Sequence, residues 1–270
     1  RKLAAVTAYD FPFASFAERA GIDLILVGDS LGMVQLGYDD TLPVTMDDMI
    51  HHCKAVRRGA PNTCVVGDMP SMSYHESNEQ AVRNAGRFIK EGRCDAVKLE
   101  WCNSVIERVK AITDAGILVM GHVGFTPQRI AQLGGYRIQG RGDAKKVVVD
   151  QGRQLQAAGA FCVLMEMVPP EVGKAVTDAL DVFTIGVGAG ADTDMQMVVI
   201  NDLLGIFDKF KPKYVKRYLD IADMATEALK QYSAEIREGQ FPAQSPERCQ
   251  QRSNTHHTSH PLKSGNNQTW

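Results

Sequence analysis

Acidic side chains stand at the ends of several short apolar runs in this sequence. Asp29, Asp68 and Glu100 each lie at or just after the end of such a run. Carboxylates gathered in a dry pocket repel one another, and a bound divalent cation removes that repulsion. All-oxygen ligands without a nearby Cys suit Mg²⁺, which keeps open positions for substrate oxygens. The three residues therefore predict one Mg²⁺ per chain, able to chelate a 2-oxo acid and to stabilise its enolate.

Glu166, which lies between Met165 and Met167, is the candidate general base. A carboxylate in an apolar strand is unfavourable unless it is paired, protonated or used at a site. Apolar neighbours would raise its pKa towards neutrality, as proton abstraction beside a ketone requires. Lys98 would then neutralise the substrate carboxylate or the developing oxyanion.

Each of these residues also has a structural interpretation. An Asp after a strand is often the N-cap of the next helix, and this remains open for Asp29 and Asp68 taken singly. Lys98 and Glu100 share one face of a strand and could form a structural ion pair. His122 could be a core histidine with satisfied hydrogen bonds. We favour a site because ionisable groups follow five consecutive apolar runs.

The elements that would position these residues repeat as a short apolar run, a loop with Gly or Pro, and a helical stretch. Such runs, apolar on both faces, are typical of a parallel sheet covered on both sides. Eight units in 270 residues favour a single (β/α)8 barrel of parallel strands, whose active site lies at the C-terminal strand ends. The expected strands are Leu3–Thr7, Ile22–Gly28, Thr63–Gly67, Asp95–Leu99, Ile117–Gly121, Ala160–Met165, Val182–Gly186 and, more weakly, Leu203–Phe207. The expected helices include Asp47–Arg58, Glu76–Glu91, Asn103–Ala115, Ala144–Ala158 and Pro170–Ala179.

The C-terminal part of the chain changes character twice. Pro212–Glu238 has the pattern of a long amphipathic helix, and after Phe241 the sequence turns to Gln, Ser, Asn and His. So little apolar content predicts disorder. We therefore expect a catalytic barrel over residues 1–242 and a polar tail over residues 243–270.

A glycine-rich segment, Gly186–Gly190, follows the seventh expected strand. It lacks the Lys-Ser/Thr of a phosphate-binding P-loop. A tight turn that lets the backbone approach the substrate is therefore favoured over a phosphate cradle. Helix-friendly sequence follows from Thr193.

Composition narrows the classes of partner. A net charge of −2 gives no electrostatic reason to expect nucleic acid or an anionic membrane surface. No apolar run approaches the ~20 residues of a membrane span, and no signal-peptide pattern is present. Six cysteines without a CxxC pair indicate a reduced, cytoplasmic protein.

A series of phrases, in order from about Lys2 to Pro242, resembles the ketopantoate hydroxymethyltransferase (3-methyl-2-oxobutanoate hydroxymethyltransferase) family. They are TAYD at Thr7–Asp10, VGDSLGM at Val27–Met33, TLPVT at Thr41–Thr45, VRRGAPN at Val56–Asn62, GDMP at Gly67–Pro70, KLE at Lys98–Glu100, GHVGFTPQ at Gly121–Gln128, GGYRIQGR at Gly134–Arg141 and GVGAG at Gly186–Gly190. The resemblance implies a TIM barrel that moves a hydroxymethyl group from 5,10-methylenetetrahydrofolate to 3-methyl-2-oxobutanoate. Ketopantoate, a precursor of pantothenate, is the implied product.

The resemblance also implies roles for single residues. Asp29, Asp68 and Glu100 become the Mg²⁺ site, and Glu166 becomes the proton acceptor. The implied contacts to the 2-oxo acid are Asp29, Ser30, Asp68, Lys98 and, as a pocket histidine, His122. The family forms homo-oligomers, commonly decamers, which is the implied assembly here. The chain departs from the family at Trp101-Cys102, where small residues are usual.

Two other readings stay open beside this one. Barrels of the phosphoenolpyruvate mutase and isocitrate lyase type also place Mg²⁺ and a 2-oxo acid on this rim, but they are expected to carry a catalytic Cys loop after strand four or five, and none is evident. A non-catalytic binding barrel predicts the loss of at least one of the acidic or basic rim residues, and all are present.

Overall fold

The computed structural model describes residues 2–210, 212 and 214–242. Its strands form one closed barrel in which every neighbouring pair is parallel and β1 closes on β8. The strands are β1 Leu3–Thr7, β2 Leu24–Val27, β3 Cys64–Asp68, β4 Ala96–Glu100, β5 Leu118–Gly124, β6 Cys162–Glu166, β7 Phe183–Val187 and β8 Met195–Val198. The predicted (β/α)8 barrel is confirmed.

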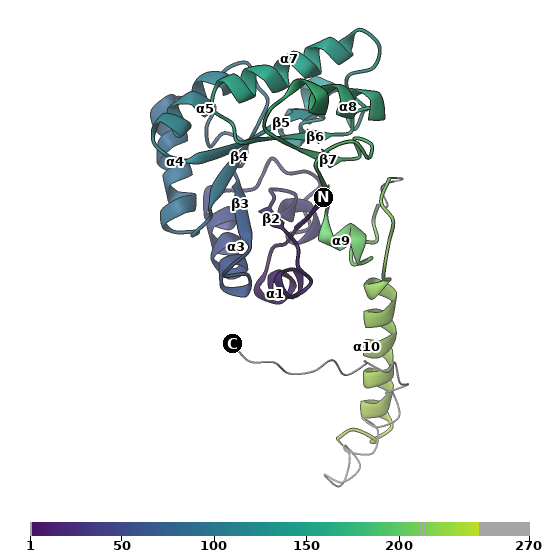
Figure 1. Ribbon diagram of the computed structural model, residues 1–270. Coiled ribbons are helices and arrows are strands. Elements are labelled where there is room, and N and C mark those ends of the chain that lie inside the picture. Colours follow the sequence, from purple (N-terminus) through teal and green to yellow (C-terminus); the bar gives the residue numbers. More distant parts are fainter. Residues whose placement is uncertain (1, 211, 213, 243–270) are drawn as a thin grey trace, which may run out of the picture. The chain divides into compact units, whose positions relative to one another are not determined.

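Helices separate the strands and lie outside the barrel, as Figure 1 shows for α3, α4, α5, α7 and α8. In chain order the helices are α1 Phe11–Arg19, α2 Leu31–Val34, α3 Met46–Gly59, α4 Asn78–Lys90, α5 Val105–Asp114, α6 Ile130–Leu133, α7 Ala144–Ala157 and α8 Pro170–Ala179, with a 3-10 turn, η1, at Pro127–Arg129, and then, after the last strand, α9 Ile200–Leu203 and α10 Ile221–Arg237. Side-chain caps begin α1, α3 and α4, with Asp10 capping α1. Thr45 forms a capping box with Asp48 at α3, and Ser77 caps α4, so free backbone N–H groups of the first turn are satisfied.

Two apolar clusters hold the barrel together. Alternate residues of each strand point inward and outward: in β2, Leu24 and Leu26 join the inner cluster, while Ile25 and Val27 join the outer one. The outer cluster fills the space between strands and helices. This packing fixes the strand register, and the register fixes which side chains meet at the rim.

Strand eight was predicted in the wrong place. The structure places β8 at Met195–Val198, within sequence we had read as helix-friendly, and Leu203 ends the short helix α9. Met and Gln favour helices, but here pairing with β1 and β7 on either side overrides that preference.

The long amphipathic helix begins later than predicted. α10 starts at Ile221, not at Pro212. The backbone N–H of Tyr218 donates to the carbonyl of Leu203, which ties this segment back to α9 in a non-helical conformation.

The chain divides into two compact units, Arg1–Leu219 with the barrel and Asp220–Trp270 with α10. The tail predicted over residues 243–270 lies outside the described residues, as does Cys249; the other five cysteines are free thiols. None of the described helices has the length and apolar character that crossing a membrane would require.

Candidate active site

Neighbouring strands bring the predicted residues side by side. Asp68 of β3 pairs in register with Lys98 of β4, and Glu100 of β4 pairs with His122 of β5. Residues at paired positions on neighbouring strands face the same side of a sheet. The barrel rim at the C-terminal ends of the strands therefore gathers acidic and basic groups from consecutive strands, as the sequence predicted.

The Lys98 ammonium lies at the centre of this group. Its Nζ is 2.8 Å from Asp68 Oδ1, 3.6 Å from Glu100 Oε1 and 3.3 Å from His122 Nδ1. Burial acts to lower the pKa of Lys98, but the neighbouring carboxylates outweigh burial and raise it above its ordinary value. Lys98 is thus a fixed positive charge, suited to binding an anion and unsuited to acting as a base.

Asp29 and Asp68 crowd against each other beside this ammonium. The backbone N–H of Asp29 donates to Asp68 Oδ2 at 2.9 Å. Burial, followed by the charges of Asp68 and Glu100, raises the pKa of Asp29 well above its ordinary value. Burial also raises the pKa of Asp68, against the opposing effect of Lys98. Neither aspartate caps the helix that follows, because α2 begins without a side-chain cap and α4 is capped by Ser77.

Glu100 behaves differently from the two aspartates. Burial would raise its pKa, but Lys98 and His122 lie close enough to lower it below its ordinary value. Its Oε1 is buried and accepts no hydrogen bond from any described residue, while Oε2 accepts the backbone N–H of Gln128 at 3.0 Å. Glu100 is therefore an ionised carboxylate with one oxygen free of hydrogen bonds, which lies 3.6 Å from Lys98 Nζ and 3.5 Å from His122 Nδ1.

His122 connects the central group to Glu166. Burial and the charge of Lys98 lower its pKa, so the ring is neutral near pH 7. Its Nδ1 lies 3.3 Å from the Lys98 ammonium and 3.5 Å from Glu100 Oε1, and the other ring nitrogen is Nε2. That nitrogen is 3.5 Å from Glu166 Oε2. His122 is therefore a site residue and not an isolated core histidine.

Glu166 ends β6 and is the most accessible acid of the set, with 20 % of its side chain exposed against 2 % for Glu100. Burial, followed by the charge of Glu100, raises its pKa to about 8. A carboxylate with this pKa can take a proton near neutral pH. The raised pKa predicted from its sequence neighbours is confirmed.

Ser30 lies directly after Asp29, at the start of α2. Its Oγ is 2.8 Å from the hydroxyl of Tyr9, a buried residue after β1. The hydrogen bond to Tyr9 thus holds the Ser30 hydroxyl in place. Sequence reasoning quoted Tyr9 only as part of the TAYD phrase and assigned it no role.

Sequence reasoning also missed two buried residues that tie the rim together, Gln128 and Tyr74. The Gln128 side chain donates to Asp29 Oδ2 at 2.9 Å, and the Tyr74 hydroxyl donates to Gln128 Oε1 at 2.8 Å. Gln128 ends the GHVGFTPQ phrase directly after strand five, which was the available signal. Tyr74 lies in a loop and carried no signal of its own.

The oxygen donors of the rim fit a hard divalent cation in charge and in type. Asp29, Asp68 and Glu100 are all buried, and Lys98 balances only one of them. Within the described ranges, no three or more His, Cys, Asp or Glu side chains are gathered around one point in a way that would hold a metal ion. Mg²⁺ does not need such a cage, because it binds through one or two carboxylates together with water and substrate oxygens.

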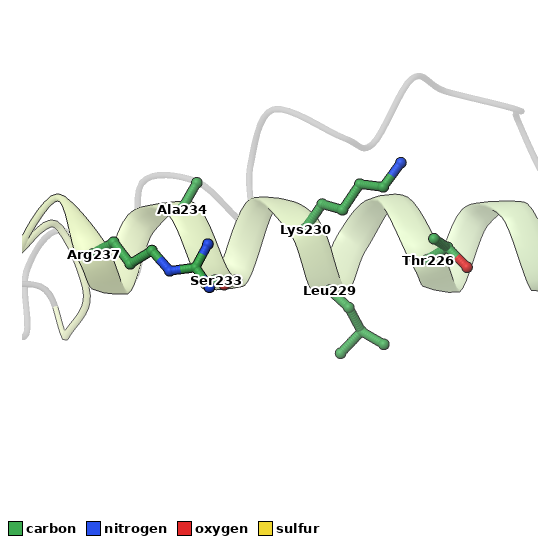
Figure 2. A pocket seen from close by; sticks show the side chains of 6 residues that line it. All are labelled: Thr226, Leu229, Lys230, Ser233, Ala234 and Arg237. Carbon is green, nitrogen blue, oxygen red and sulfur yellow. The ribbon is translucent and has the colours of Figure 1, made fainter.

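Two surface hollows are lined by residues other than those of this rim. Figure 2 shows one along α10, of about 420 Å³, and another of about 500 Å³ lies at the start of α7. Each is lined by residues of a single helix and its flank, without an opposing wall among the described residues. Neither contains a candidate site residue, so we place the site by its chemistry.

Gly124 fixes the approach of β5 to Glu166 and gives a test of the rim. Its φ is +87°, and a Cβ there would lie 2.4 Å from the carbonyl oxygen of Glu166. That oxygen also accepts the backbone N–H of Phe125 at 2.8 Å. We expect Gly124→Ala to lower the free energy of unfolding by about 1–3 kcal/mol, measured by urea denaturation. Gly86→Ala in α4, where nothing lies within 4 Å of the added Cβ, should instead stabilise by roughly 0.5–1 kcal/mol. Equal stability of the two variants would contradict this account.

Comparison with known proteins agrees with the chemistry of the rim. A family model described as "Ketopantoate hydroxymethyltransferase" matches residues 1–244. A protein of Alkaliphilus metalliredigens, named 3-methyl-2-oxobutanoate hydroxymethyltransferase, is 56% identical over 242 residues, which are 89% of this chain and 86% of that protein. A protein of the same name from Moorella thermoacetica is 53% identical over 245 residues, 90% of this chain and 91% of the relative.

Solved structures share the fold at low sequence identity. A 2,3-dimethylmalate lyase of the PEP mutase/isocitrate lyase superfamily superposes with a TM-score of 0.58 and 15% identity, over 94% of this chain and 87% of that chain. A phosphonopyruvate hydrolase complex with oxalate and Mg²⁺ gives a TM-score of 0.59 and 14% identity, over 95% and 94% of the two chains. At these identities the likeness concerns the barrel fold alone.

Proposed function

The chain belongs to the ketopantoate hydroxymethyltransferase family, whose activity is hydroxymethyl transfer to 3-methyl-2-oxobutanoate, and from this membership we propose how its residues serve the reaction and that 5,10-methylenetetrahydrofolate is the donor. The product is ketopantoate, a precursor of pantothenate. The observation that carries the proposal is the contact between one buried ammonium, Lys98, and the carboxylates around it at the C-terminal rim.

In this proposal Asp29, Asp68 and Glu100 hold the Mg²⁺ ion. The ion, when bound, polarises the ketone of the 2-oxo acid and so acidifies the neighbouring C–H bond. Asp29 and Asp68 support this role because both are buried and both gain from an added positive charge. Glu100 supports it through its free buried oxygen.

Five residues bind and orient the 2-oxo acid in the proposal. Lys98 supplies the positive charge for the substrate's anionic oxygens, and Ser30 offers a hydroxyl already oriented by Tyr9. His122, as a neutral ring between Lys98 and Glu166, contributes its Nε2, which is 3.5 Å from Glu166 Oε2. Asp29 and Asp68 complete the binding surface beside the cation.

Glu166 moves the proton. Its carboxylate takes the proton from C3 of 3-methyl-2-oxobutanoate, and the electron pair of the broken C–H bond forms the new C–C bond to the one-carbon unit of the folate. The two bonds from that unit to the folate nitrogens break, so that tetrahydrofolate leaves and water supplies the hydroxyl group. The pKa of about 8 suits this task, because a base with a pKa near the working pH combines adequate basicity with a sufficient ionised fraction.

The direct test is ketopantoate formation by the purified full chain. With 3-methyl-2-oxobutanoate, 5,10-methylenetetrahydrofolate and Mg²⁺ present, we expect product by mass spectrometry, and omitting the folate should abolish it. Product formed without folate would overturn the proposed donor. No product with all components present would overturn the proposed reaction.

We also propose that the protein is cytoplasmic and that it assembles as a homo-oligomer, for example a decamer. Among the described residues, α10 has no buried side chain, and its apolar Met224 and Leu229 are 63 % and 66 % exposed. Apolar side chains in such numbers on one helix favour contact with another copy. Light scattering coupled to size exclusion should give a mass of several chains, and a 29.6 kDa particle would contradict the proposal.

A further inference from the structure

Gln128 contacts the rim through three polar groups: its side-chain Nε2, its side-chain Oε1 and its backbone N–H. Its Nε2 lies 2.9 Å from Asp29 Oδ2 and 2.9 Å from the carbonyl oxygen of Met69. Its Oε1 accepts from the Tyr74 hydroxyl, and its backbone N–H donates to Glu100 Oε2. The Gln128 side chain thus reaches the ends of β2 and β3, and its backbone N–H reaches the end of β4.

These contacts allow only one orientation of the Gln128 amide. Both acceptors, Asp29 Oδ2 and the Met69 carbonyl, need a donor, which the NH₂ group supplies with its two protons. A reversed amide would place Oε1 against a carboxylate and a carbonyl. The Tyr74 hydroxyl accepts the backbone N–H of Glu100 at 3.2 Å and gives its single proton to Gln128 Oε1.

Tyr74 is itself fixed from behind. It is fully buried, and Arg108 Nε donates to its carbonyl oxygen at 3.0 Å, with a further contact from the Arg108 guanidinium to Asn78 at the start of α4. The order of support runs from Arg108 through Tyr74 and Gln128 to the carboxylate of Asp29. Through these contacts, the helices α4 and α5 orient the Asp29 carboxylate.

We propose that Gln128 is a positioning residue for the cation site, holding the Asp29 and Glu100 carboxylates in the orientation that receives a divalent cation. The inference rests on the proposed function, because it concerns the same site. Residues that orient metal ligands typically contribute about 10–100-fold to metal affinity. The Gln128 amide contacts one proposed ligand directly, Asp29, so removal of the amide should fall in that range.

The test uses Mn²⁺ as the probe and the full chain without either substrate. The dissociation constant is obtained from the loss of the free Mn²⁺ signal in electron paramagnetic resonance. We expect Gln128→Leu, which keeps the volume but removes the amide, to raise the Kd about 10–100-fold. Gln132→Leu, at an exposed position of α6 whose side chain contacts only Arg129 among the described residues, is the matched control and should keep the parent Kd.

Tyr74→Phe provides a second variant, which removes a single oxygen from the same network. It should weaken Mn²⁺ binding less than Gln128→Leu, and combining the two should give no further loss, because Tyr74 acts through Gln128. This non-additivity would not arise from two independent losses of stability. If Gln128→Leu does not fold, folded Tyr74→Phe carries the test alone: weaker Mn²⁺ binding is expected, and an unchanged Kd would overturn the positioning role.

The outcomes separate the two proposals. If the parent binds Mn²⁺ and folded Gln128→Leu binds it equally well, with only a lower melting temperature, Gln128 is structural and its positioning role is overturned. If the parent itself does not bind Mn²⁺, the proposed cation site is wrong, and the role of Gln128 falls with it.

Discussion

Glu166→Gln should abolish proton removal from C3 of 3-methyl-2-oxobutanoate while leaving the protein folded. The amide keeps the size of the carboxylate and can still contact His122 Nε2, which lies 3.5 Å from Glu166 Oε2 in the parent. It cannot accept a proton from carbon. General bases typically contribute about 10²–10⁴-fold, so kcat should fall within that range, whereas binding of the 2-oxo acid should survive.

Deuterium exchange at C3, followed by NMR with Mg²⁺ present and folate omitted, isolates this step. The parent should exchange the proton and Glu166→Gln should not. The control is Glu171→Gln in the first turn of α8, where the side chain is exposed; it should exchange at the parent rate. If Glu166→Gln exchanges as fast as the parent, Glu166 is not the base, and His122 becomes the next candidate.

The same exchange reaction should depend on pH in a defined direction. Glu166 acts as a base only when ionised, and burial raises its pKa to about 8. The exchange rate should therefore rise with pH through this region and level off above it. A rate that is constant from pH 5 to pH 9 would mean that the proton acceptor keeps the ordinary pKa of an exposed carboxylate.

Replacing both rim aspartates, Asp29→Asn with Asp68→Asn, should abolish turnover and cation binding together. The two amides keep the shape of the side chains but remove two of the three negative charges that favour a divalent cation. Lys98 would then lose its nearest carboxylate partner, at 2.8 Å. We expect activity at least about 10²-fold below that of the parent, because the loss of metal ligands removes the cation together with the chemistry that it supplies.

Chelation tests the same point without substitution. Dialysis against EDTA should remove the activity of the parent, and added Mg²⁺ should restore it. The matched control carries Asp39→Asn with Asp114→Asn, two exposed aspartates, and should behave like the parent. Full activity in the chelated, metal-free parent would show that the rim works without a cation.

Most of the barrel could be predicted because seven strands are continuous apolar runs. β1 and α8 match their predicted bounds, Leu3–Thr7 and Pro170–Ala179. β8 could not be found in this way, because Gln196 interrupts a run of residues that individually prefer helix. Its conformation comes from partners on both sides, β1 and β7, which are distant in sequence or separated from it by a loop.

The acidic and basic residues of the site were accessible to sequence reasoning because a barrel carries all strand ends to one rim. Asp68, Lys98 and Glu100 meet as the strand positions predicted. The supporting residues were not accessible. Tyr74 contacts Gln128 across 54 positions of sequence, and neither residue type indicates a site on its own. Their contribution depends on hydrogen-bond geometry, which spacing does not encode.

The crowding of carboxylates at the rim implies a trade-off between activity and thermal stability in this protein. Asp29 and Asp68 hold protons more tightly in the folded chain than exposed aspartates do, so keeping them ionised near neutral pH favours the unfolded chain. An uncharged substitution at Asp29 would relieve that tension while removing a group on which turnover is proposed to depend; at Asp68 it would also leave the buried Lys98 without its nearest partner. Selection for thermal tolerance alone would therefore drift towards inactive barrels. Selection in the presence of the cation would not, because an ion bound only by the folded chain stabilises it.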